Sequence, residues 1–356
     1  METHSKPLKI IILSDGKKGH LNQSLAVAQL IHHATIQIVP ITYKSRFHQF
    51  LLDILTYFLR NKKIYTSLLY FSLTDPAPME AGIKPEKGGI VISAGSSLCS
   101  LNFALSKILA AKSIVIMKPL CGFNYDLQII PKHDHPPKNL KTVVTLGAPT
   151  IISELNLAPY AQKLASSLKP SHRHMISVFI GGNSKYHCLT SQITDTLIQK
   201  LDQICHLKNM DLLITTSRRT PLNSIQKIKT HFLHHPYCRL LMIPTESSQP
   251  EHVPEHLIEG MLGLASLVLV TQDSVSMISE AASSGKKVMV IEIEPLKKHT
   301  KHKDMLKTLV QEGYVSTCPP GTLDKAVIEK LADETPVKRL QDSAHIRPAL
   351  QRLLSK

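Results

Sequence analysis

Short apolar runs typical of β-strands alternate with helical patterns along most of this 356-residue chain, and the alternation stops and then restarts. In the first half, the strand-like runs are residues 10–14, 36–43, 89–94, 113–117, 127–130 and 142–146. In the second half, they are residues 175–180, 211–215, 240–243, 267–270 and 288–293. Strands separated by helices form parallel sheets. The sequence therefore predicts an α/β protein with two doubly wound, Rossmann-like domains that face each other across a cleft.

The two halves are predicted to meet at residues 166–174, a polar stretch that contains a proline. The chain is also longer than one hydrophobic core usually organises, which favours two domains. We therefore expect a first domain over residues 1–165 and a second over residues 175–330. Residues 331–356 are expected to form a helix that packs back on the first domain.

The composition indicates a folded protein with an anionic partner. Apolar residues make up 43% of the chain and charged residues 19%, and the formal net charge is +15. Such a charge favours a nucleoside diphosphate sugar or an acidic lipid surface as partner. We expect no nucleic acid partner, because the basic residues are spread along the chain and no nucleic-acid-binding motif occurs.

The cysteines and the N-terminal residues favour a cytoplasmic protein. The six cysteines are scattered and form no CxxC pair, which is typical of reduced thiols in the cytosol. The first residues lack the apolar region of a signal peptide, and no apolar span of about 18 residues exists. We expect a cytoplasmic chain, with any membrane contact peripheral on the inner face.

The stretch over residues 8–30 predicts the first candidate site. Its apolar, β-branched run breaks into a polar turn, and a helix is expected to begin at residues 22–24. The candidate residues of this turn are Asp15, Gly16, Gly19 and His20. The first turn of a parallel sheet lies at the edge where such folds bind ligands, and the glycines would let the backbone approach one. His20 or Asp15 would act as a general base, and the alternative is a sharp turn with a solvated His20.

Three turns at predicted strand ends of the second domain form the second candidate site. The candidate residues for binding a nucleotide sugar are Gly182, Asn183, Lys185, Ser217, Arg218, Arg219, Asp273, Ser274, Ser276 and Glu280. Arg218 and Arg219 precede a helix and suit a diphosphate, because guanidinium groups and helix N–H groups share its oxygens. Ser274 and Ser276 would hold phosphate at a further helix start, and Glu280 would accept hydroxyls of a ribose or sugar.

Two of these turns also have a simpler interpretation. Arg218 and Arg219 also fit a solvated basic turn, and Asp273 and Ser274 also fit a plain helix cap. We favour the binding site because three such turns follow strands of a single predicted domain.

Six segments of the chain carry a resemblance to a known family. In order, they are DGKKGHLNQS, ISAGSS, the PKHD segment, FIGGNSKYH, TTSRRTP and TQDSVSMISEA. Together they resemble the mitochondrial-fission ELM family, which comprises the plant "elongated mitochondria" protein and many bacterial relatives. The resemblance implies a GT-B-like fold, the two-domain architecture of many nucleotide-sugar glycosyltransferases. The plant member recruits a division dynamin, so the resemblance also allows a non-catalytic role.

An aromatic and basic segment over residues 44–73 is the candidate membrane-facing surface. Its apolar stripe at helical spacing is Phe47, Phe50, Leu51, Ile54, Leu55 and Phe58, and its basic ends are Lys44, Arg46, Arg60, Lys62 and Lys63. Amphipathic helices of this kind lie on anionic membrane surfaces. Core packing is the alternative, since a doubly wound domain needs helices that cover its sheet.

These features favour a glycosyltransferase that moves a sugar from a nucleotide-activated donor to an envelope glycolipid or polysaccharide acceptor. No Asp-x-Asp metal motif occurs, so we expect metal-independent catalysis in which cationic groups and a helix start neutralise the leaving group. The nucleotide sugar would be a donor substrate, and no cofactor is expected. The alternatives are a nucleotide-sugar epimerase, which needs no acceptor, and a non-catalytic membrane-associated scaffold.

Overall fold

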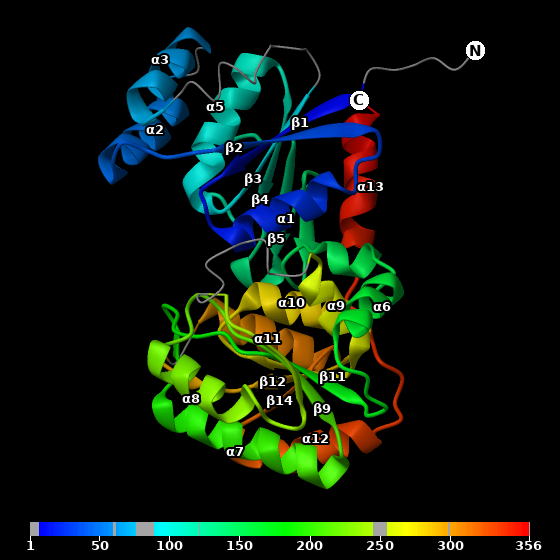
Figure 1. The fold of residues 1–356 in the computed structure, drawn as a ribbon. Helices are drawn as coiled ribbons and strands as arrows, with labels where there is room; N and C mark the ends of the chain where they lie inside the picture. Colours follow the sequence, from blue (N-terminus) through cyan, green and yellow to red (C-terminus); the bar gives the residue numbers. More distant parts are fainter. Residues whose placement is uncertain are drawn as a thin grey trace, which may run out of the picture. The chain divides into compact units, whose positions relative to one another are not determined.

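The computed structural model describes residues 7–59, 62–75, 89–120, 122–244, 255–297 and 300–355. The chain forms two compact units. Unit 1 consists of Met1–Ile151 and Asp342–Lys356, and unit 2 consists of Ile152–Gln341. Each unit is built on a six-stranded parallel sheet with helices on both of its faces (Figure 1).

The sheet of unit 1 has the strand order β2-β1-β3-β4-β5-β6. Its strands are β1 (Leu8–Ser14), β2 (Ala34–Pro40), β3 (Ile90–Ala94), β4 (Lys112–Ile116), β5 (Leu127–Pro131) and β6 (Thr142–Thr145). The chain runs from β1 to β2 on one side and then places β3 on the other side of β1. Ligands of such sheets bind at the carboxyl ends of the strands beside this reversal. The loops after β1 and β3 therefore lie where a ligand is expected.

Alternate residues of β1 enter two different apolar clusters, because successive side chains of a strand point to opposite faces. The helices of unit 1 are α1 (Lys18–Ala28), α2 (Arg46–Phe58), α3 (Lys62–Ser72), α5 (Cys99–Leu109) and α13 (Ser343–Leu354). Ile10 and Ile12 pack with α1 and α13, whereas Ile11 and Leu13 pack with α2, α3 and α5. An uninterrupted apolar run is what a strand covered on both faces requires.

The main sheet of unit 2 has the strand order β10-β9-β7-β11-β12-β14. Its strands are β7 (Met175–Phe179), β9 (Asp211–Thr215), β10 (Cys238–Met242), β11 (Ala265–Thr271), β12 (Lys287–Ile291) and β14 (Ser316–Cys318). Two short strands, β8 (His187–Cys188) and β13 (Glu294–Pro295), form a separate antiparallel sheet. The strand order reverses between β7 and β11, so the loops after these two strands are the expected ligand-binding loops.

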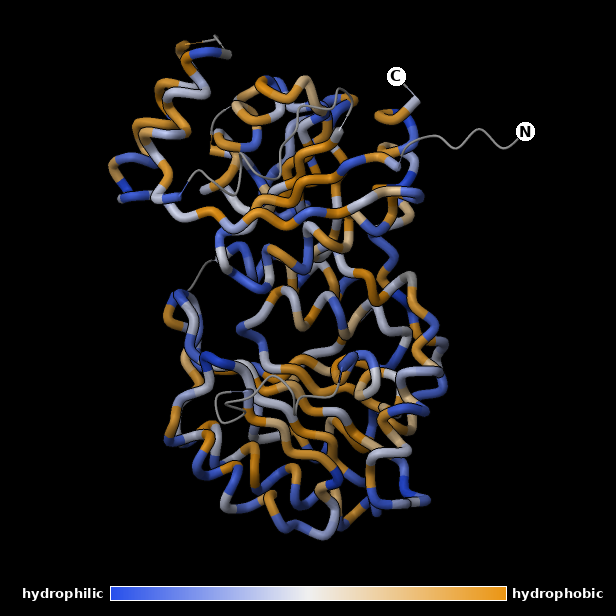
Figure 2. Tube along the Cα trace, turned by 45° about the horizontal axis from the view of Figure 1, so that its top comes forward, coloured by the Kyte–Doolittle hydropathy of each residue, from blue (hydrophilic) through white to orange (hydrophobic). Residues whose placement is uncertain are grey.

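The helices of unit 2 are α6 (Ala158–Ser167), α7 (Ser191–Lys208), α8 (Leu222–Phe232), α9 (Leu257–Leu264), α10 (Val275–Ser283), α11 (Lys301–Gln311) and α12 (Leu323–Ala332). Helices α7, α8 and α12 share one apolar cluster with the strands. The strands at the centre of each sheet are hydrophobic along most of their length, as Figure 2 shows.

The two doubly wound α/β units confirm the predicted fold class. The division of the chain differs from the predicted one, because α6 packs along α9 and so belongs to unit 2. Unit 1 therefore ends at Ile151 instead of residue 165, and the polar stretch 166–174 lies inside unit 2. The returning helix is α13, which begins at Ser343 and packs on β5 and β6 of unit 1.

Two further expectations concern cysteines and membrane spans. The five described cysteines are free thiols, and Cys121 lies outside the described residues. In the described ranges, no helix has both the length and the apolar character needed to cross a membrane.

Candidate functional site

In unit 1, the loops after β1 and β3 meet at His20. The imidazole Nδ1 lies 3.1 and 3.0 Å from the two carboxylate oxygens of Asp15. Ser97, which follows β3, donates from its hydroxyl to Asp15 Oδ2 at 3.4 Å. Gly95 has a φ of +90°, and a Cβ at this position would lie 2.5 Å from His20 Cε1. A glycine here therefore leaves the space that the imidazole ring fills.

Asp15 holds this arrangement together. Lys17 Nζ lies 2.6 Å from Asp15 Oδ2, and the Lys17 backbone N–H donates to Oδ1 at 3.3 Å. Burial raises the pKa of Asp15, but the hydrogen bonds from Lys17 and the charges of His20 and Lys17 outweigh it, so this pKa lies below its usual value. An ionised Asp15 favours the His20 tautomer that carries its proton on Nδ1, which leaves Nε2 as a proton acceptor.

The helix that follows β1 begins earlier than the sequence predicts. α1 starts at Lys18, so Gly19 and His20 lie in its first turn and not in the preceding loop. Gly16 turns the chain into the helix with a φ of +77°, whereas Gly19 is not among the glycines with positive φ. Of the two predicted loop glycines, only Gly16 needs the conformational freedom of glycine.

In unit 2, a buried carboxylate joins the loops that follow β7, β9 and β11. The side chain of Asp273 has no exposed area, and its Oδ2 lies 2.8 Å from Nη2 of Arg219. The same oxygen accepts the backbone N–H of Gly182 at 3.0 Å, and Oδ1 accepts the hydroxyl of Thr271 at 2.7 Å. Asp273 thus fixes the three loops at the carboxyl edge of the sheet, next to the reversal of strand order.

The glycines after β7 permit close packing of these loops. A side chain at Gly181 would overlap the carboxylate of Asp273, and one at Gly182 would overlap the backbone carbonyl of Arg219. The backbone of Arg219 therefore occupies the space beside Gly182. The next residue, Asn183, donates its backbone N–H to the Arg219 carbonyl at 3.0 Å and is exposed.

The two neighbouring arginines have different surroundings. Arg219 pairs with Asp273 and also donates from Nη1 to the Asn183 carbonyl at 3.4 Å. Its backbone N–H donates to Ser217 Oγ at 3.1 Å, which shapes the turn. Arg218 is exposed, and it has no hydrogen-bond or ion-pair partner within the described ranges. Arg218 is therefore available for an anion, while Arg219 organises the loops.

The remaining predicted residues lie near the start of α10 or in the loop after β7. Ser274 is the N-cap residue of α10, and its Oγ accepts the Met277 N–H at 3.5 Å. Ser276 and Glu280 are half-buried residues of the same helix. Lys185 is exposed, with its Nζ 5.7 Å from the centre of the Tyr186 ring.

Sequence reasoning missed two members of the unit 2 site. Thr271 accepts the Gly181 N–H at 2.7 Å in addition to its bond to Asp273. His187 is 2% exposed; burial lowers its pKa, and the charge of Asp273 acts in the opposite direction. Thr271 begins the segment TQDSVSMISEA and His187 ends the segment FIGGNSKYH, so the resemblance contains both residues, but neither segment shows that their side chains lie near Asp273.

On unit 1, α2 exposes much of the predicted apolar stripe. Phe47, Phe50, Ile54 and Phe58 are between 37% and 72% exposed, whereas Leu52 and Thr56 are the buried residues of α2. The exposed basic residues near this surface are Lys44, Arg46 and Lys63. Leu51 and Leu55 are half-buried, and Arg60 lies outside the described residues. The face that meets the core is thus not centred on the predicted stripe.

Comparison with known families gives a match over nearly the whole chain. The model of the family described as mitochondrial fission ELM1 matches residues 18–346. This chain belongs to the mitochondrial fission ELM1 family. The chain is similar to an uncharacterised Rickettsia prowazekii protein, RP120, which is 26% identical over 86% of this chain and 89% of that protein. The Arabidopsis thaliana mitochondrial fission protein ELM1 is 27% identical over 65% of this chain and 57% of its own length.

Solved structures show the same fold at low sequence identity. The UDP-GlcNAc 2-epimerase of Neisseria meningitidis, solved with UDP-GlcNAc bound, superposes with a TM-score of 0.56 at 13% identity, covering 98% of this chain and all of that chain. This chain therefore has the GT-B-like fold of nucleotide-sugar epimerases and glycosyltransferases, as the resemblance implied.

Proposed function

We propose that this chain binds a nucleotide sugar through unit 2 and transfers the sugar to an envelope glycolipid or polysaccharide. The observation that carries the proposal is the ion pair between Arg219 and Asp273, at 2.8 Å. It joins the loop that presents Arg218 to the loop that presents Ser274. An exposed guanidinium and a helix start are thereby held at one edge of the sheet, which suits the two phosphates of a nucleoside diphosphate.

The roles in unit 2 follow from this pairing. Arg218 binds phosphate oxygens, and the N–H groups at the start of α10, with Ser274 and Ser276, bind the remaining ones. Glu280 accepts hydroxyls of the ribose or the sugar. Lys185 and Arg218 offset the negative charge that develops on the leaving nucleoside diphosphate, which is the contribution that lowers the barrier most in such reactions.

The proton transfer is assigned to unit 1. His20 Nε2 takes the proton of the acceptor hydroxyl. As it does so, the hydroxyl oxygen forms a bond to the anomeric carbon of the sugar, and the bond between this carbon and the phosphate oxygen of the donor breaks. Asp15 orients the ring and stabilises the imidazolium, as the carboxylate does in other histidine-based sites. We therefore propose His20 as the base and Asp15 as the group that orients it, where the sequence alone leaves either residue as the base.

The second candidate is a nucleotide-sugar epimerase. The likeness to the Neisseria meningitidis UDP-GlcNAc 2-epimerase favours it, because the same fold there holds UDP-GlcNAc. An epimerase changes the sugar without an acceptor, so conversion of a nucleotide sugar in the absence of any acceptor distinguishes the two reactions.

The acceptor is proposed to lie at a membrane. The exposed aromatic residues of α2, with Lys44, Arg46 and Lys63, suit the interface of an anionic lipid layer, where aromatic rings and basic ends each find a favourable environment. A lipid-linked acceptor would be presented at such a surface.

The test of nucleotide binding is calorimetry with a panel of nucleotide sugars that includes UDP-GlcNAc. We expect Arg218→Ala to weaken binding by about 1.5–3 kcal/mol, as for a lost charged hydrogen bond, or roughly 10- to 150-fold. Lys208→Ala is the matched control, because it removes the same charge from an exposed position at the far end of α7. Equal affinities for the two variants would contradict the assignment of Arg218, and no binding by the native chain would favour the scaffold.

A further inference from the structure

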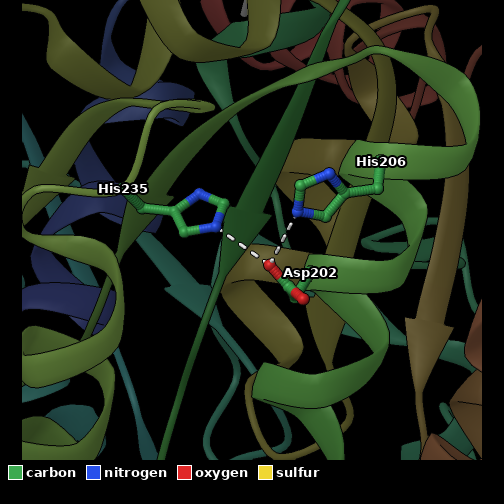
Figure 3. Close-up of side chains that lie close together, drawn as sticks. All are labelled: Asp202, His206 and His235. Carbon is green, nitrogen blue, oxygen red and sulfur yellow. Dashed lines mark hydrogen bonds and ion pairs between the residues drawn. The ribbon is translucent and has the colours of Figure 1, made fainter.

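Three histidines surround one carboxylate at the ends of α7 and α8. Asp202 Oδ1 lies 2.9 Å from His235 Nε2, 3.6 Å from His206 Nε2 and 3.7 Å from His231 Nε2. The ligand atoms of Asp202, His206 and His235 all lie within 4.8 Å of one another. Figure 3 shows the rings of His206 and His235 both directed toward the carboxylate of Asp202.

The sequence brings these side chains together through two pairs spaced four residues apart. Asp202 and His206 lie on one face of α7, because residues four apart are neighbours on a helix. His231 lies in the last turn of α8, and His235 follows three residues after the helix ends. The rings of His231 and His235 stack at 5.3 Å with an interplanar angle of 23°.

We propose that Asp202, His206 and His235 bind a divalent transition-metal ion of the zinc class. Zn²⁺ prefers imidazole nitrogen and carboxylate oxygen in a tetrahedral arrangement with bonds of about 2.0–2.2 Å, which separates neighbouring ligand atoms by roughly 3.4 Å. The pairs of Asp202 with His206 and with His231 are already near this spacing. The contact between Asp202 and His235 must lengthen by a few tenths of an ångström, and the nitrogens of His206 and His235, which lie within 4.8 Å of each other, must reach the same spacing. Water or His231 completes the coordination.

Binding of the ion requires the other neutral tautomer of His235. The Tyr237 backbone N–H donates to His235 Nδ1 at 3.4 Å, so the single ring proton lies on Nε2 and faces Asp202. When the ion binds Nε2, that proton leaves to solvent and Nδ1 takes up a proton from solvent, so the ring stays neutral and gives up its contact with the Tyr237 N–H. Asp202 Oδ1, which contacts the three histidines, would then bind the ion, and its single negative charge neutralises half of the charge of the ion.

The place of the cluster in unit 2 gives the ion a structural role. The ends of α7 and α8 lead into β9 and β10, so the cluster lies at the amino ends of these strands. The proposed nucleotide site lies at the carboxyl ends of the sheet. The ion therefore ties the end of α8 to α7 and takes no part in sugar transfer.

The test is a titration of the chelator-treated full chain with Zn²⁺, followed by calorimetry and by thermal unfolding. We expect one site per chain. We expect Zn²⁺ binding to weaken by at least about tenfold in each of the variants Asp202→Asn, His206→Gln and His235→Gln. Loss of a group that only hydrogen-bonds to a metal ligand already costs about this much, and loss of the ligand itself should cost no less. Zn²⁺ should raise the unfolding temperature of the native chain and lose this effect in the variants.

The matched control is His234→Gln, an exposed histidine next to His235 that is not part of the cluster. It should bind Zn²⁺ like the native chain. His206 is 58% exposed, so His206→Gln is expected to fold even if His235→Gln does not. With Co²⁺ as probe, the visible absorption of a tetrahedral site should appear in the control and be lost in His206→Gln. Unchanged metal binding in His206→Gln, or an equal loss in the control, would overturn the proposal.

Discussion

Asp15 and Asp273 each join loops that are distant in the sequence. The sequence identifies both as candidates, because each follows a strand-like run at the edge where ligands bind. It leaves their roles open, since these depend on partners such as Ser97, 82 residues after Asp15. In the same way, nothing local shows that Arg219 pairs with the buried Asp273 while Arg218 stays exposed. The sequence thus predicts which polar residues lie at the carboxyl edge of a sheet. It does not predict which side chains distant in the sequence bind one another there.

The first residue-scale prediction concerns His20. We expect His20→Ala to lower sugar transfer by about 100-fold or more while nucleotide affinity stays near the native value, because the ring supplies the proton acceptor and not the phosphate site. Turnover and calorimetry on the same preparation measure both quantities. Ser97→Ala serves as the control, since it removes only the 3.4 Å contact to Asp15. Native turnover in His20→Ala would shift the base to another group.

At the scale of elements, the periodicity of α2 is predictable but its orientation is not. The sequence shows which residues share a helix face. The register against the sheet depends on α3 and α5, which pack into the same cluster as Leu52. The strands are predicted more closely, because each buried run must alternate between two faces. Even there, β2 ends at Pro40 instead of residue 43.

The element-scale prediction is that α2 binds anionic membranes. A chain with Phe47, Phe50 and Phe58 replaced by serine should no longer float with vesicles that contain anionic lipid, because the exposed apolar area is lost. Native binding should weaken as salt rises, since the basic residues contribute about 1 kcal/mol each near such a surface. Leu207→Ser with Leu222→Ser is the control, because both leucines are exposed on unit 2. If the triple variant still floats while folded, α2 is not the membrane surface.

At the scale of the whole molecule, the chain leaves unit 1, builds unit 2 and then returns to complete unit 1. The sequence predicts a C-terminal helix that packs back on the first domain. It does not predict that α6 belongs to unit 2, because an amphipathic helix between two domains fits either one. At the return, Asp342 accepts the backbone N–H groups of Leu146 and Gly147 at 2.9 and 2.8 Å. Unit 1 is therefore made from both ends of the chain.

The last prediction tests this dependence through α13. Leu350 is 2% exposed and packs with Ile346 against the strands of unit 1. Leu350→Ala should lower the free energy of unfolding of unit 1 by about 2–5 kcal/mol, through lost apolar burial and the cavity left behind. Hydrogen exchange measures the effect by element: protection should fall in β1, β3 and β5 and stay near native in β7 and β11.

Leu354→Ala is the matched control on the same helix, because this leucine is 44% exposed. Its effect should remain within about 0.5 kcal/mol, as for other surface substitutions. Since α13 lies about 200 residues after β6 in the sequence but packs on it, a loss confined to unit 1 can arise only if the returning helix is part of that core. Equal loss of protection in both units would instead mean that the chain unfolds as a single cooperative body.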